Sequence, residues 1–319
     1  MNRGFPVERV LVTGAGGFVG GYLLEALSRH YPGRRIVGTG LGPEGGSPLV
    51  PLDVTDAAAV RRLIGDIRPD LCIHLAAVAS VDQSFQQARA AWDVNLGGTL
   101  NVAEAVLEFA PTCRLVFASS GEVYGLSFAD GEPASEQTIL SPANPYATAK
   151  AAADLALGEM ALRGLRVIRL RLFNHTGAGQ TEQYVLPRFA AQVARIAEGL
   201  QEPVIYTGAL DRWRDFLDVR DVVNAYIAGA QAPEDGFHVN ICSGIPRRVG
   251  DILDELMEVA RVSAQVVQRV SEVRRTDMRC AVGSPQRAAV LLDWRPRIAW
   301  EETLSSLLTH WRQKAAHSR

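Results

Sequence analysis

The sequence predicts an α/β fold, with a doubly wound parallel sheet covered by helices on both faces and a smaller, mostly helical second domain. Through residue 173, short apolar runs alternate with longer segments of helical periodicity. Continuous apolar runs are typical of strands buried on both faces, as in a parallel sheet. After Phe173 this alternation ends, because Gly, Gln, Thr and Pro interrupt the apolar and helical segments between Asn174 and Gly208. A second, more irregular domain is therefore expected to interleave with the sheet domain.

Each expected element rests on the distinction between a short apolar run and a longer periodic segment. The expected strands are Val10–Thr13, Arg35–Thr39, Leu49–Leu52, Leu71–Ala76, Leu115–Ser119, Val167–Phe173 and Phe237–Ile241. The expected helices are Phe18–Tyr31, Ala57–Ile67, a long helix that includes Asn95–Phe109, Pro145–Leu162 and Val219–Ala230. From Arg247 onward the chain is expected to be mostly helical. The sheet domain is assigned to residues 1–173 and 219–241, and the smaller domain to residues 174–218 and 242–319.

The composition argues against several classes of protein. The chain has 319 residues, of which 47% are hydrophobic and 21% charged, and its formal net charge is −2. Because Lys and Arg are scattered along it, nucleic acid or an acidic membrane surface is not an expected partner. The first residues, MNRGFPVERV, lack the apolar stretch of a signal peptide, and no segment reaches the ~20 apolar residues of a spanning helix. We therefore expect a soluble, cytoplasmic protein with reduced cysteines. These are Cys72, Cys113, Cys242 and Cys280.

A glycine-rich turn lies between the first expected strand and the first expected helix. Gly14, Gly17 and Gly20 follow a G-x-x-G-x-x-G spacing, since Val19 breaks the G-x-G-x-x-G pattern of the simplest dinucleotide fingerprint. Glycine permits a tight turn, a close approach of the backbone to a pyrophosphate, and close packing of helix on sheet. The helix N-terminus then offers free N–H groups and a partial positive charge to phosphates. We therefore expect a Rossmann-type dinucleotide site here.

The end of the second expected strand bears on which dinucleotide binds. NAD-selective sites usually place an acidic residue there to hold the ribose 2′-hydroxyl. This chain reads Ile36-Val-Gly-Thr-Gly-Leu-Gly at that place, without an acid. NADP, as NADPH, is therefore favoured, and NAD remains possible because no arginine follows to meet a 2′-phosphate. Asp53 either approaches the adenine or caps the helix that begins near Thr55.

Two further segments carry residues suited to proton transfer at a carbonyl. Tyr146 and Lys150 form Y-x-x-x-K at the start of an expected helix, so both side chains lie on one face a turn apart. An ammonium beside a phenol stabilises the phenolate, and we expect it to pull the pKa of Tyr146 down from ~10 towards neutrality. Ser120 and Glu122 follow the end of an expected strand, where an open sheet forms its ligand crevice. Ser120 is expected to hydrogen-bond a substrate oxygen, with simple turn chemistry as the alternative.

Together with Leu75-Ala-Ala77 at a strand end and Asn95 on a helix, these segments resemble the extended short-chain dehydrogenase/reductase family over nearly the whole chain. In that family the serine and tyrosine bind the reacting sugar oxygen and the lysine holds the nicotinamide ribose. The resemblance implies Ser120, Tyr146 and Lys150 as catalytic residues, with Glu122 as a further candidate, and it implies no metal site. The cofactor-binding residues that it implies are Gly14, Gly17, Phe18, Val19, Gly20, Asp53, Val54, Leu75, Ala76, Ala77, Asn95, Tyr146, Lys150 and Phe173.

Within that family, the second half resembles the GDP-4-keto-6-deoxy-mannose reductases. The segments that carry this resemblance are Leu172–Gln180, Arg214–Asp221, Asn240–Gly244 and Trp294–Ile298. It implies that Arg214 and Arg274 clamp the nucleotide diphosphate, with the neighbouring Arg275 as an alternative to Arg274. Asn174 and His175 would contact sugar or phosphate, although His175 can also be a satisfied loop histidine. Ala178 departs from the pattern, since the reductases tend to carry proline there.

The resemblance implies that NADPH or NADH reduces the 4-keto group of a GDP-linked 4-keto-6-deoxy sugar, giving the rhamnose or the talose configuration. A sugar-nucleotide 4,6-dehydratase is the main alternative. It needs an added base and acid, and Glu122 keeps the position of the base whereas Gly121 has no acidic side chain. A 4-epimerase is a second alternative, and a catalytically inactive nucleotide-binding protein would be expected to lack Tyr146 or Lys150. Dimers of the family commonly pair through the helices that carry Asn95 and Tyr146, so a homodimer is expected.

Overall fold

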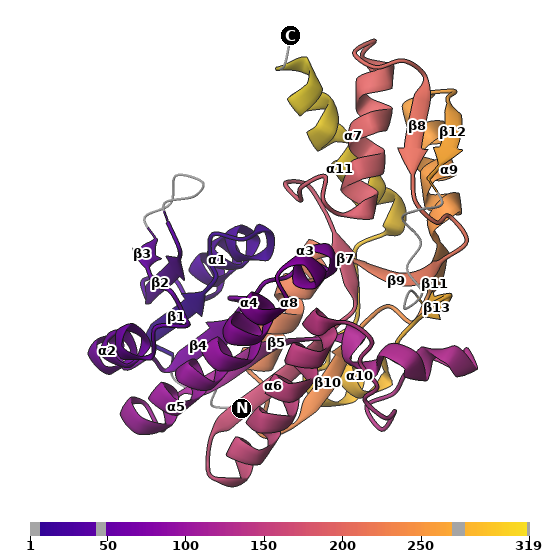
Figure 1. The fold of residues 1–319 in the computed structure, drawn as a ribbon. Helices are drawn as coiled ribbons and strands as arrows, with labels where there is room; N and C mark the ends of the chain where they lie inside the picture. Colours follow the sequence, from indigo (N-terminus) through magenta and orange to yellow (C-terminus); the bar gives the residue numbers. More distant parts are fainter. Residues whose placement is uncertain (1–6, 43–48, 270–277, 318–319) are drawn as a thin grey trace.

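The main sheet of the computed structural model, which describes residues 7–42, 49–269 and 278–317, has seven parallel strands. Their order is β10-β6-β5-β4-β1-β2-β3, so the direction of winding reverses between β1 and β4 (Figure 1). Such a reversal defines a doubly wound sheet and opens a ligand crevice at the carboxyl ends of the strands. The predicted fold class is confirmed. The strands are β1 (Arg9–Thr13), β2 (Arg35–Gly40), β3 (Val50–Pro51), β4 (Leu71–His74), β5 (Arg114–Ser120), β6 (Arg166–Leu172) and β10 (His238–Ile241).

Helices cover both faces of this sheet. One apolar core joins it to α1 (Phe18–His30), α8 (Val219–Ala230) and α10 (Gln286–Leu292). A second core joins the other face to α2 (Ala57–Ile67), α5 (Thr99–Phe109) and α6 (Pro145–Leu162). Because Ala288, Leu292 and Trp294 lie in the first core, we propose that residues 286–294 belong with the sheet domain and not with the smaller one. The other domain boundaries stay predictions.

The expected long helix around Asn95 is present, but it changes its winding. It runs from α4 (Ala88–Trp92) through a wider π-helical segment, η1 (Asp93–Gly98), into α5. Short α3 (Val81–Gln86) precedes it, and the 3₁₀ segment η2 (Gly121–Asp130) follows β5. Wider turns of this kind inside α-helices often occur at functional sites.

The smaller unit stands on one side of the molecule, where Figure 1 shows α7, α9 and α11 beside β8 and β12. Its core is formed by α7 (Val185–Ala197), α9 (Val249–Ala260) and α11 (Trp300–Ala316). It also contains two small sheets: β9 (Trp213–Asp218) with β7 (Asn174–Thr176), β11 (Pro246–Arg248) and β13 (Cys280–Ala281), and β8 (Val204–Thr207) with β12 (Gln265–Gln268). The strands after Arg247 were not expected, because runs of two to four residues give no periodic signal.

In the part of the chain that the structure describes, we find no helix with both the length and the apolar character needed to cross a membrane.

Candidate active site

Packing requires glycine at two positions of the turn after β1. Gly14 has φ +70°, and a Cβ there would lie 2.5 Å from the backbone nitrogen of Ala76. A Cβ on Gly20 would lie 2.3 Å from the carbonyl oxygen of Ala15. Gly17, by contrast, is exposed and caps α1, whose first turn carries no acidic side chain. The free N–H groups and the positive end of the helix dipole therefore face outward at the crevice, as a pyrophosphate requires.

Asp53 lies at the expected adenine end of this crevice. It is exposed, and its Oδ1 accepts hydrogen bonds from the backbone nitrogen of Thr55 at 2.9 Å and from its hydroxyl at 2.8 Å. The alternative of a helix cap at Asp53 is wrong, because Asp56 is the residue that caps α2, accepting from the nitrogen of Ala59 at 3.0 Å. The turn with Thr55 leaves the second carboxylate oxygen of Asp53 at the surface, where it can approach an adenine.

Asn95 holds the loop that follows β4. Its Oδ1 accepts from the nitrogen of Val78 at 2.8 Å, and its Nδ2 donates to the carbonyl oxygen of Val78 at 3.1 Å. It thereby fixes residues 75–77, which pass over Gly14. Val54 packs against the same π-helical segment, since a Cβ on Gly98 would lie 2.5 Å from its Cγ2. Asn95 is buried, so its side chain positions the cofactor loop through Val78.

The structure brings Ser120, Tyr146 and Lys150 together. Asn144 caps α6 by accepting from the nitrogen of Ala147 at 2.8 Å, which places Tyr146 and Lys150 one turn apart at the start of the helix. Ser120 ends the adjacent β5, and its side chain lies close enough to that of Tyr146 to lower the pKa of the phenol. Lys150 is buried, and its Nζ donates to the carbonyl oxygen of Ala118 in β5 at 2.9 Å.

The electrostatics of this group differ from the prediction. Burial raises the pKa of Tyr146 to about 12, although the side chain of Ser120 lowers it, and the charge of Glu122 raises it further. Burial also lowers the pKa of Lys150 to about 7. The expected depression of the Tyr146 pKa is therefore wrong, because desolvation favours the neutral form of both groups. At neutral pH, Tyr146 is a protonated phenol, which suits it to donate a proton to a developing alkoxide.

Glu122 lies at the same site, partly exposed. Its backbone nitrogen donates to the hydroxyl of Ser120 at 3.1 Å, and its Oε2 lies 3.5 Å from the Nδ2 of Asn144. The residue thus fixes the Ser120 side chain through its backbone, while its carboxylate acts on the pKa of Tyr146.

Phe173 lies behind this group with its ring buried. It is 4% exposed and packs with Tyr124 and Phe128 in a small core of its own. A Cβ on Gly121 would lie 2.9 Å from the ring, and one on Gly283 would lie 2.6 Å from it. The expected role of Phe173 in binding the cofactor can therefore involve only its backbone.

The predicted substrate loop lies beside the cofactor turn. The ring of His175 stacks on that of Phe18, at 6.4 Å between centroids and 8° between planes. The hydroxyl of Tyr22 donates to the carbonyl oxygen of Ala178 at 2.7 Å. Burial lowers the pKa of His175, which favours the neutral imidazole, whereas Asn174 is exposed. The loop thus joins the cofactor side of the crevice to the smaller unit.

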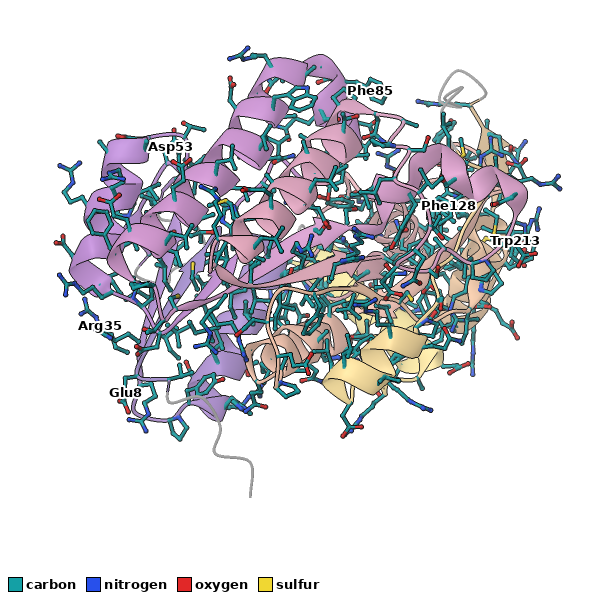
Figure 2. The ribbon with its side chains drawn as sticks, turned by 90° about the horizontal axis from the view of Figure 1, so that it is seen from below. Glu8, Arg35, Asp53, Phe85, Phe128 and Trp213 are labelled. Atoms are coloured by element: carbon teal, nitrogen blue, oxygen red, sulfur yellow. The ribbon has the colours of Figure 1, made fainter. Side chains whose placement is uncertain are left out.

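Arg214 lies on β9, the strand that pairs with β7 of this loop. The pairing places Asn174 opposite Phe216, and the partly buried Arg214 donates from Nη1 to the carbonyl oxygen of Trp213 at 2.8 Å. In Figure 2, Trp213 and Asp53 lie towards opposite ends of the molecule. Arg274 and Arg275 lie outside the described residues.

A buried ion-pair network behind the catalytic group was missed by the sequence reasoning. Asp154, one turn after Lys150 on α6, is fully buried and accepts from the Nε and Nη2 of Arg171 at 3.0 and 3.1 Å. The hydroxyl of Ser119, the residue before Ser120, donates to Asp154 at 2.6 Å. The spacing of 146, 150 and 154 along one helix face was the available signal.

Among the described residues, no group of His, Cys, Asp and Glu side chains is placed to hold a metal ion.

Comparison with known proteins agrees with this arrangement. Residues 11–307 match the model of a protein family described as GDP-mannose 4,6 dehydratase. The chain is 33% identical over 312 residues to the GDP-6-deoxy-D-mannose reductase of Pseudomonas aeruginosa, covering 96% of this chain and 98% of that protein. Its structure is similar to that of RMD from Pseudomonas aeruginosa complexed with NADPH, with a TM-score of 0.84, 32% identity and coverage of 96% and 99%. It is also similar to the UDP-glucose 4-epimerase of Thermus thermophilus in complex with NAD, with a TM-score of 0.83, 29% identity and coverage of 95% and 99%. The chain therefore belongs to the GDP-mannose 4,6-dehydratase family, within the extended short-chain dehydrogenases/reductases that its motifs resemble.

Proposed function

We propose that the protein is an NAD(P)-dependent oxidoreductase that reduces the 4-keto group of GDP-4-keto-6-deoxy-D-mannose, giving GDP-D-rhamnose or its talose epimer. The observation that carries this proposal is the grouping of Ser120, a neutral Tyr146 and Lys150 at the same carboxyl edge of the main sheet as the glycine turn. The reductase relative, which this chain matches over 96% of its length, supports the choice of reaction and substrate.

The residues of the crevice fit a nicotinamide dinucleotide. Gly17 leaves the N-terminus of α1 open to a pyrophosphate, and Asp53 is exposed at the adenine end. When bound, the reduced nicotinamide supplies the hydride. Tyr146 gives its proton to the oxygen at C4, and Ser120 donates a hydrogen bond to the same oxygen. Lys150 holds the ribose hydroxyls of the nicotinamide half.

NADPH is the favoured cofactor and NADH is possible. β2 ends at Gly40 and is followed by the exposed Leu41, so neither of these two positions carries an acid that would repel a 2′-phosphate. The solved relative from Pseudomonas aeruginosa was complexed with NADPH, whereas the epimerase from Thermus thermophilus was complexed with NAD.

The surroundings of Gly121 favour reduction over dehydration. A dehydratase needs an acid as well as the base that Glu122 can provide. The ring of Phe173 fills the space into which a side chain at position 121 would project, so this position can contribute no proton donor. Reduction requires only the one donor, which Tyr146 supplies.

The test is oxidation of NADPH by the purified protein with GDP-4-keto-6-deoxy-D-mannose, with NADH measured in parallel. Substrate-dependent oxidation is expected, and identification of the sugar product gives the configuration at C4. A folded preparation that binds NADPH but does not oxidise it would contradict the proposal. GDP-mannose would then be tested for dehydration through Glu122.

We also propose a homodimer that pairs through the helices carrying Asn95 and Tyr146. A hollow along α4, η1 and α5 is lined by Trp92, Leu96 and Leu100 together with the charged Arg89 and Asp93. Leu155 on the adjacent α6 is 61% exposed. Sedimentation of the wild type against Leu155→Glu would test this: a dimer that dissociates in the variant is expected, and a monomeric wild type would contradict it. The cytoplasmic location stays a prediction.

A further inference from the structure

Two arginines face each other across the small sheet of the smaller unit. β9 and β11 are antiparallel, and their register places Arg247 directly opposite Arg214. Directly opposite residues of an antiparallel pair project from the same face, with Cβ atoms about 4.5–5.5 Å apart. Like charges in this arrangement repel each other and destabilise the sheet. The pair therefore calls for an explanation beyond strand pairing.

Arg247 has donors that the described part of the chain leaves unused. Its guanidinium carbon lies 4.3 Å from the centroid of the Trp300 ring, on which it stacks. Its Nε is buried without a hydrogen-bond partner, and none of its nitrogens forms a hydrogen bond or ion pair with a described residue. Burial lowers the pKa of Arg247, with the charges of Glu255, Glu301 and Asp215 acting in the opposite direction.

The nearby carboxylates do not explain the position of this guanidinium. Glu255 accepts from the Nε1 of Trp300 at 2.9 Å. Asp215 accepts from the backbone and the hydroxyl of Ser243 and from the backbone of Gly244. Both carboxylates already accept hydrogen bonds from other donors, and neither they nor Glu301 forms an ion pair with Arg247 in the described part of the chain. Stacking on Trp300 satisfies none of the donors of Arg247. Stacking does hold the planar guanidinium in one orientation, which prepares it to bind an anion.

We propose that Arg247 is a second guanidinium of the substrate diphosphate site, acting opposite Arg214. This inference rests on the proposed function, which makes the substrate a nucleoside diphosphate sugar and gives Arg214 to its diphosphate. A diphosphate carries two charged groups, and two facing guanidiniums neutralise them with charge-assisted hydrogen bonds. The bound anion also removes the repulsion between the two arginines. The site recognises the diphosphate and does not select the base.

The test compares Arg247→Met with Arg248→Met, a matched control on the same strand. Arg248 already pairs with Asp251 at 2.8 Å and is partly exposed. Titration calorimetry would measure the binding of GDP and, separately, of NADPH. Arg247→Met should weaken GDP binding roughly tenfold to a hundredfold, since a charge-assisted contact is lost. NADPH binding should not change, Arg248→Met should resemble the wild type, and Arg247→Lys should lie between.

A folded Arg247→Met protein that binds GDP as the wild type does would overturn the inference and leave Arg247 a structural role against Trp300. If Arg247→Met does not fold, Arg247→Gln against Arg247→Lys gives the same comparison, with a loss of GDP binding in the glutamine variant alone supporting the inference. A wild type that binds UDP or dTDP but not GDP would refute the proposed substrate, and loss of that binding in Arg247→Met would still support the diphosphate role. A wild type that binds no nucleoside diphosphate would refute both.

Discussion

The packing of Phe173 against Gly121 leads to a prediction about stability. A Cβ on Gly121 would lie 2.9 Å from two ring carbons of Phe173 and 3.0 Å from a third. The ring has no free space on the side of Gly283, whose own Cβ would lie 2.6 Å from it. Because the ring cannot retreat, Gly121→Ala should lower the free energy of unfolding by about 1–3 kcal/mol, the usual cost of overpacking.

A double-mutant cycle separates this clash from other effects. Phe173→Ala alone should cost about 3–5 kcal/mol, because it leaves a cavity in a buried cluster. In the double variant the new methyl group at position 121 projects into that cavity, so the overpacking cost of about 1–3 kcal/mol should disappear. Urea unfolding of the wild type, both single variants and the double variant measures the four free energies. Gly21→Ala is the matched control, since a Cβ there meets nothing within 4 Å and should be neutral or stabilise α1 by roughly 0.5–1 kcal/mol.

Additive free energies, within about 0.3–0.5 kcal/mol, would refute the reasoning, because they would show that the ring of Phe173 is not the obstacle at position 121. The same packing predicts that Gly121→Asp does not turn the protein into a dehydratase. Formation of the 4-keto-6-deoxy sugar from GDP-mannose by that variant would contradict this.

Three other perturbations test the catalytic group and its support. Tyr146→Phe should lower kcat of NADPH oxidation about 10²–10⁴-fold, the usual loss of a general acid. It should leave the Kd of NADPH almost intact, since the ring is kept, and a loss of cofactor binding would argue against the assigned role. Burial lowers the pKa of Lys150 from 10.5 to about 7. Below pH 7 the buried ammonium therefore reduces the free energy of unfolding of the wild type, and this free energy increases as the pH rises from 7 towards 10.5. The unfolding free energy of Lys150→Met minus that of the wild type, measured by urea unfolding, should therefore fall over that range. A difference that does not depend on pH would show that the ammonium is not desolvated. Asp154→Asn should cost about 3–5 kcal/mol of unfolding free energy, because it leaves buried arginines without their carboxylate. Glu25→Gln, at an exposed pair with Arg29 on α1, should cost only about 0–1 kcal/mol, and equal losses in the two variants would rule out the buried network as a strong contribution.

The sequence predicts best where the signals are local. The bounds of Ala57–Ile67, Pro145–Leu162 and Val219–Ala230 agree between sequence and structure. Each of these helices begins at a side chain that can be recognised in the sequence, since Asp56, Asn144 and Asp218 cap them by accepting from backbone nitrogens. The glycine turn is equally local, because its place between strand and helix defines what the glycines must do.

Features that depend on long-range packing were not predictable. β4 ends at His74, earlier than expected, where the chain turns to pass over Gly14. The packing of α10 on the main sheet and the facing of Arg214 and Arg247 depend on contacts between distant segments. The pKa of Tyr146 is a further case, since the spacing to Lys150 indicates a favourable charge but not the desolvation that opposes it.

The number of proton donors at the site bears on the choice between reduction and dehydration. Reduction at C4 consumes one proton, and Tyr146, with its pKa raised to about 12, holds one at neutral pH. The charge of Glu122 contributes to that rise, so this carboxylate helps to keep the donor protonated even if it takes no part as a base. Elimination of water across C5 and C6 would need a further acid, and the ring of Phe173 leaves no room for one at Gly121. The presence of Glu122 is therefore as compatible with a reductase as with a dehydratase, and the packing around Gly121 is the feature that separates the two.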